Sequence, residues 1–114
     1  MARVITELEA MNEALAHASF VLGVDIAYLR DSSRYSIEIV LGASPKAECS
    51  QIVLQADGLV EFQLKSLGGG LSQFSCLRIE DVRERQLDRI RFRVRDIEND
   101  RIEFLCSDVR VAED

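Results

Sequence analysis

The chain has 114 residues, of which 47% are hydrophobic and 30% charged, and its formal net charge is −6 at pH 7. This length and composition favour one folded domain over residues 1–114 and exclude a disordered chain. The acidic balance disfavours unspecific binding to nucleic acid. The sequence has no apolar run of roughly 18 residues that could span a bilayer and no start typical of a secretory signal, so we expect a cytoplasmic protein.

An amphipathic helix is predicted over residues 1–18. Five apolar residues recur there at spacings of three and four, which places them on one stripe: Val4, Leu8, Met11, Leu15 and Ala18. Thr6 and Glu9 have the spacing of a capping box, which would move the helix start to Thr6. The stripe predicts a helix that packs one face on the rest of the domain.

Alternation with a period of two replaces the helical period from Phe20 onward. If Ser32 and Ser33 form a two-residue turn, Tyr28 pairs with Ile37 and the apolar residues of both runs share one face. This arrangement predicts a first β-hairpin with one buried side.

A second hairpin is expected around Gly58. A three-residue loop with Gly58 in the left-handed conformation pairs Leu54 with Val60 and Ile52 with Phe62. A two-residue loop would put the two apolar sets on opposite faces, so the longer loop is favoured.

A third hairpin is predicted near the C-terminus, where apolar residues alternate with arginines. Its expected register pairs Val94 with Phe104, and Phe92 with Cys106. The same register sets Arg95 opposite Glu103 on the outer face.

Together these elements indicate an α+β fold. We expect an N-terminal amphipathic helix packed on one strongly curved antiparallel meander sheet of six to seven strands. A cystatin-like wrap and a partly open barrel satisfy this pattern equally well.

Three consecutive glycines, Gly68, Gly69 and Gly70, lie between two predicted strands. A phosphate-binding loop would need a helix directly after the glycines, and none is predicted there. We therefore expect a mobile connection beside an interface, since a simple turn does not need three glycines.

The arginine row consists of Arg89, Arg91, Arg93 and Arg95. Alternation places all four on one face of a strand, about 7 Å apart. Such a row suits either cross-strand salt pairs or a surface for a protein partner. Nucleic acid is disfavoured, because the chain is acidic and no aromatic residue shares the arginine face.

No catalytic or metal-binding pattern is found. The three cysteines, Cys49, Cys76 and Cys106, are too widely spaced for a zinc site and are odd in number, so we expect small buried side chains. His17 has no spaced ligand companions. The sequence therefore predicts no metal and no cofactor.

These observations favour a small non-enzymatic, bacterial-type interaction module that binds another protein, in an adaptor or immunity-like role, and that self-associates. The alternative is a curved sheet or open barrel that binds a small ligand in a concave apolar pocket lined by Tyr28, Tyr35 or Phe62. A third hypothesis is an enzyme that uses scattered carboxylates, the tyrosines and His17.

Overall fold

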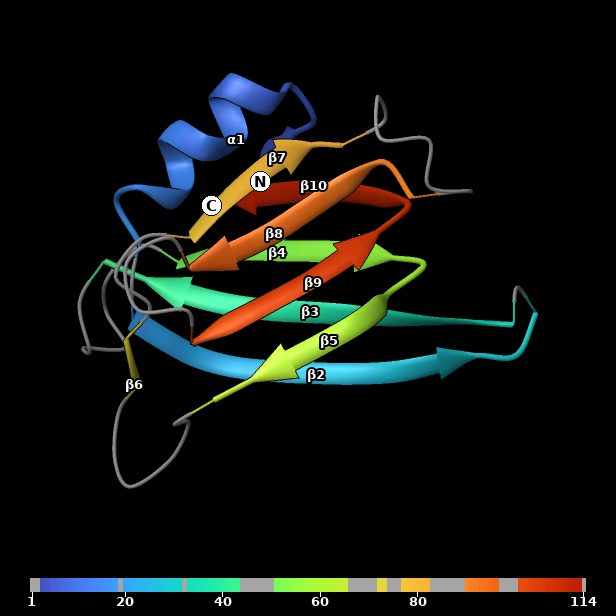
Figure 1. The fold of residues 1–114 in the computed structure, drawn as a ribbon. Coiled ribbons are helices and arrows are strands. Elements are labelled where there is room, and N and C mark those ends of the chain that lie inside the picture. The colour runs from blue at the N-terminus through green and yellow to red at the C-terminus, as the bar shows by residue number, and fades with distance from the viewer. Residues whose placement is uncertain are drawn as a thin grey trace.

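The computed structural model describes residues 3–18, 20–31, 33–43, 51–65, 72–73, 77–82, 90–96 and 101–113. These residues form two antiparallel sheets and one short helix (Figure 1). The strands of the smaller sheet run obliquely across those of the larger one (Figure 1). The α+β class is therefore confirmed in broad outline.

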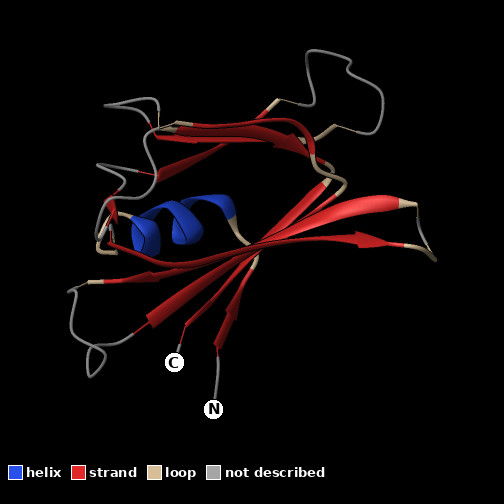
Figure 2. Ribbon diagram, turned by 90° about the horizontal axis from the view of Figure 1, so that it is seen from below, coloured by secondary structure: helices blue, strands red, loops and turns tan. Residues whose placement is uncertain are grey.

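The larger sheet has six strands in the order β1-β10-β4-β3-β2-β6. They are β1 (Arg3–Ile5), β2 (Phe20–Leu29), β3 (Arg34–Gly42), β4 (Gln51–Asp57), the two-residue β6 (Ser72–Gln73) and β10 (Asp108–Glu113). β1 and β10 pair from opposite ends of the chain, with Ile5 opposite Val111. This pairing holds the two ends of the chain side by side (Figure 2).

The smaller sheet has four strands in the order β5-β9-β8-β7. They are β5 (Val60–Leu64), β7 (Leu77–Asp81), β8 (Phe92–Asp96) and β9 (Ile102–Cys106). The chain enters this sheet directly after β4, through Gly58, whose φ of 70° is a conformation that favours glycine.

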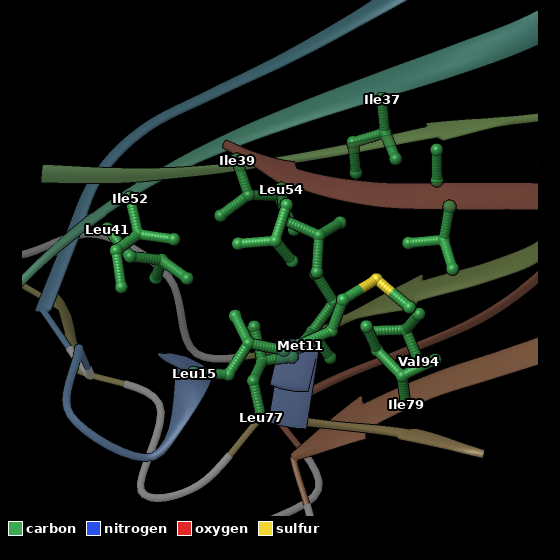
Figure 3. Close-up of a cluster of buried hydrophobic side chains, with 14 of the residues drawn as sticks. Met11, Leu15, Ile37, Ile39, Leu41, Ile52, Leu54, Leu77, Ile79 and Val94 are labelled. Atoms are coloured by element: carbon green, nitrogen blue, oxygen red, sulfur yellow. The ribbon is translucent and has the colours of Figure 1, made fainter. Parts of the chain in front are cut away.

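The helix α1 (Leu8–Leu15) lies between the two sheets (Figure 2). Met11 and Leu15 are 1% exposed and point into a cluster of apolar side chains from both layers (Figure 3). The larger sheet supplies Ile37, Ile39, Leu41, Ile52 and Leu54 to this cluster, and the smaller sheet supplies Leu77, Ile79 and Val94. Burial of these side chains supplies the main favourable term in folding.

The single curved sheet was wrong, as were the cystatin-like wrap and the partly open barrel. The apolar face of the larger sheet is covered by the helix and by a second, separate sheet. Strands with one apolar face fit both a single curved sheet and two packed sheets. Alternation of apolar residues indicates which face is buried but not what covers it.

The predicted helix was also too long. Val4 fits the stripe by spacing, yet it lies on β1 opposite Ala112 and is 58% exposed. Glu7 is the N-cap residue and makes no side-chain cap hydrogen bond, so the capping box of Thr6 and Glu9 is not formed. Pairing with β10 therefore overrides the helical spacing of the first residues.

Two hairpin registers need correction. Tyr28 lies opposite Tyr35, not Ile37, because the turn is longer than two residues. A bulge between Val21 and Gly23 shifts the register again at the other end of β2. The predicted pairing of β4 with β5 does not occur. β4 pairs with β3 and β10, whereas β5 pairs with β9.

The third hairpin is confirmed residue by residue. Phe92 lies opposite Cys106, Val94 opposite Phe104 and Arg95 opposite Glu103. Cys106 is fully buried, as expected for a small apolar side chain. Cys49 and Cys76 lie outside the described residues.

Candidate interaction surface

The β2–β3 hairpin is longer than its neighbours and reaches past the body of the protein (Figure 1). β4 pairs with β3 only as far as Ser36, which lies opposite Asp57. The hairpin continues beyond that point with Tyr28 opposite Tyr35 and Leu29 opposite Arg34. Its outer end therefore has no neighbouring strand on the β4 side among the described residues.

Apolar side chains on the inner face of the hairpin lose their cover toward its tip. Along β2, Val21 is 8% exposed, Ile26 is 42% exposed and Tyr28 is 51% exposed. Tyr35 on β3 is 53% exposed, and its ring centroid lies 5.1 Å from that of Tyr28. The same face that forms the core of the larger sheet thus becomes solvent-exposed beyond the smaller sheet.

We call four exposed side chains the hairpin patch: Ile26, Tyr28 and Tyr35 on the β2–β3 hairpin, and Val60 on the smaller sheet. Val60 opens β5 of the smaller sheet and is 41% exposed. An open hollow of about 340 Å³ connects Val60 with Tyr35. It is lined by Ser33, Arg34, Tyr35, Gly58, Leu59, Val60, Ile90 and Ser107. Clustered apolar side chains with a polar rim are typical of a surface that binds another protein.

Backbone and side-chain hydrogen bonds fix the base of the patch. The Leu59 N–H donates to the Tyr35 carbonyl at 3.0 Å, which joins the start of β3 to the crossing between the sheets. The Ser107 hydroxyl donates to the Asp57 carbonyl at 3.0 Å. These bonds tie the start of β3 and the crossing between the sheets together beneath the patch.

The outer face of the larger sheet is acidic. Asp25 lies directly opposite Glu38, and Asp57 lies directly opposite Asp108. Arg110 donates to Gln55 at 2.8 Å and lies 3.5 Å from the Asp57 carboxylate. Asp25 and Glu38 have no cationic partner among the described residues. Like charges directly opposite each other on a sheet are unfavourable.

The arginine row is only partly described. Arg89 lies outside the described residues, and Arg91 is exposed. Arg93 forms an ion pair with Glu103, and Arg95 Nε lies 2.8 Å from Glu80 Oε1. The two described members on β8 are therefore engaged with carboxylates of neighbouring strands. Whether the row binds a partner stays a prediction.

The three glycines Gly68, Gly69 and Gly70 lie outside the described residues, so their predicted role at an interface also stays a prediction. No group of three metal-binding side chains is found in the described part of the chain. The one helix described there is neither long nor apolar enough to cross a membrane.

Comparison with known proteins identifies the family. The family model described as Immunity protein PIM8 matches residues 5–112. The chain belongs to this family. No curated protein and no solved structure gives a significant match.

Membership of the Immunity protein PIM8 family makes the chain a small interaction module of the immunity type, with a non-enzymatic role. An immunity protein acts by binding a protein partner, in general a toxin. The expected interaction module is therefore confirmed at this level, and the enzyme hypothesis is not supported.

Sequence reasoning placed Tyr28 and Tyr35 on the correct face but expected that face to be buried. It did not single out Ile26 or Val60. Strand length is the signal that would have found them. The sequence predicts strands in the first hairpin that are longer than the strand around Val60. A strand that short cannot cover the whole apolar face of the hairpin, so one end of that face has to remain exposed.

Proposed function

We propose that this protein neutralises a toxin by binding it through the hairpin patch. The observation that supports this most is the Tyr28–Tyr35 pair, which lies half-exposed on a hairpin that extends past the two-sheet body. Exposed apolar residues that lie next to one another on a small protein commonly mark a binding surface.

The chemistry of the patch suits protein recognition. Each tyrosine offers a large apolar ring and one hydroxyl, which gives contact area at a low cost in side-chain entropy. Arg34 and Ser33 line the adjoining hollow and supply polar groups beside the apolar side chains. An apolar centre with a polar rim is the usual composition of an interface.

A growth-rescue screen tests this function and identifies the toxin in the same experiment. Genomic fragments from the source organism are expressed, and those that stop growth unless this protein is co-expressed are kept. The selected fragment is then purified, and its binding is measured by calorimetry. We expect Tyr28→Ala and Tyr35→Ala to abolish rescue and weaken binding.

Val4→Ala is the matched control, because Val4 is as exposed as the tyrosines but lies on β1, away from the hairpin. It should leave rescue and binding unchanged. Equal rescue by the tyrosine variants and the control would contradict the role of the hairpin patch.

Self-association and a cytoplasmic location remain predictions from the sequence. Light scattering on the purified protein measures the first directly. A monomer at all concentrations would rule out a constitutive homodimer, and toxin binding would still stand. A small-molecule ligand in the hollow beside Tyr35 is the second candidate, favoured only by the volume of that hollow.

A further inference from the structure

Four strands form the edges of the two sheets, and three of them are protected. β1 has only three residues, and β5 is interrupted by a register shift between Val60 and Gln63. On β7, the backbone of Ile79 is bound by the side chain of Asn12. Short length, bulges and coverage by a neighbouring element are the usual ways in which a sheet edge is kept from pairing with other chains.

The fourth edge strand is β6, which has only two residues, so β2 itself forms this edge over most of its length. Beyond the bulge between Val21 and Gly23, β2 has none of these protections among the described residues. β6 pairs with it only at Phe20 and Val21. From Gly23 to Tyr28, no described strand lies along the edge of β2 that faces away from β3. This segment, which we call the β2 edge, contains neither lysine nor proline. Alternate residues of such an edge present unpaired N–H and C=O groups.

The two faces of the β2 edge specify what could pair with it. Val24, Ile26 and Tyr28 lie on the inner face and are continuous with the hairpin patch. Asp25 lies on the outer face, opposite Glu38, and neither carboxylate forms an ion pair with a described residue. Arg110 lines the same shallow hollow, but its guanidinium contacts Gln55 and Asp57. A strand that alternates apolar and basic residues would contact the first face and neutralise the second.

A second copy of this chain fits less well. Antiparallel pairing of two β2 edges would bring a second Asp25 and a second Glu38 to the same face, where like charges are already opposed. The net charge of −6 on each copy adds to this repulsion.

We propose that the β2 edge accepts an extended segment of the toxin by β-strand addition, and that this segment alternates apolar and basic residues. The proposal rests on the proposed function, which it deepens by naming the chemistry of the partner segment. Backbone hydrogen bonds supply affinity in this mode, and the alternating side chains supply specificity.

Amide hydrogen exchange measured by NMR on the full chain tests the proposal without the toxin. The probe is a short peptide that alternates valine and lysine, and the control peptide alternates valine and glutamate. We expect the lysine peptide to slow exchange of alternate amides between Gly23 and Tyr28 by about tenfold or more at saturation. The glutamate peptide should leave these amides unchanged.

A charge reversal gives the matched variants. Asp25→Lys should abolish the effect of the lysine peptide, whereas Asp31→Lys, at the exposed turn beyond β2, should preserve it. Unchanged exchange with the lysine peptide, equal slowing by both peptides, or a dimer whose β2 amides are already protected overturns the proposal.

The toxin itself separates this proposal from the proposed function. If toxin binding depends on Tyr28 while the β2 amides exchange as in the free protein, strand addition is wrong and neutralisation through the hairpin patch stands. If neither tyrosine variant affects rescue, the function proposed for the patch fails, whatever the peptides show.

Discussion

Asn12 binds both backbone groups of Ile79. Its Nδ2 donates to the Ile79 carbonyl at 2.9 Å, and its Oδ1 accepts from the Ile79 N–H at 2.7 Å. Ile79 lies on β7 at the edge of the smaller sheet, so the amide occupies the place of a further strand. The contact ties α1 to that sheet and protects one edge, while the β2 edge stays open among the described residues.

Replacing Asn12 with alanine should lower the free energy of unfolding by about 1–3 kcal/mol, because a part-buried donor and acceptor on Ile79 lose their partner. Asn12→Asp should also destabilise, since a carboxylate oxygen would face the Ile79 carbonyl. Urea unfolding measures both effects. Glu13→Ala, one residue along on the exposed side of the helix, is the control and should change stability little.

Met11→Ala should cost about 2–5 kcal/mol of unfolding free energy. The Met11 side chain is 1% exposed and lies between the two sheets, so its removal leaves a cavity that both layers line (Figure 3). Chemical denaturation gives the value, with Glu9→Ala on the exposed helix face for comparison. A loss no larger than that of Glu9→Ala would mean that the helix does not pack between the sheets.

Gly58→Ala should destabilise by about 1–2 kcal/mol or more, because φ at this residue is 70° and an L residue is disfavoured there. A methyl group would also overlap the Ser107 hydroxyl. The double variant Gly58→Ala/Ser107→Gly removes the overlap but not the backbone strain, so thermal unfolding should show partial recovery. Full wild-type stability in the single variant would disprove this conformation of the crossing.

Cys106 should resist thiol reagents until the protein unfolds. Burial, followed by the charges of Asp108 and Asp57, raises the pKa of its thiol from 9.0 to about 12. Above pH 9 the unfolded thiol loses its proton while the folded one keeps it, so the free energy of unfolding falls as pH rises from 9.0 toward about 12. Cys106→Ala should show a smaller fall over the same range, measured by urea unfolding at each pH.

The parts of the fold that depend on local pattern were predictable. Val94 and Phe104 were paired correctly, because strict alternation on both strands and the short turn predicted between them leave one register that buries both. Met11 and Leu15 were placed on the buried face of the helix for the same reason, since helical spacing is a local property.

Long-range pairings were not predictable by this route. Val4 continues the helical spacing, but its partner Ala112 lies at the other end of the chain. Leu54 and Val60 have the facing parity of a hairpin, yet Gly58 leads the chain from one sheet to the other. Parity cannot distinguish a neighbouring strand from a strand in the opposite layer.

The same limitation of apolar alternation explains why the hairpin patch was not predicted. Tyr28 and Tyr35 were expected to be buried because they alternate with polar residues, and alternation contains no information on where the covering sheet ends. Their exposure depends on the short β5, which begins only at Val60. The difference in length between the predicted strands of the first hairpin and the strand at Val60 indicates the hairpin patch, whereas apolar periodicity does not.

The most direct test of toxin neutralisation through the hairpin patch is calorimetry of the toxin selected by growth rescue with wild type, Tyr28→Ala and Val4→Ala. We predict that Tyr28→Ala raises Kd by about tenfold or more and that Val4→Ala leaves it unchanged. Equal Kd values for wild type and Tyr28→Ala, with both variants folded, would contradict binding through the hairpin patch.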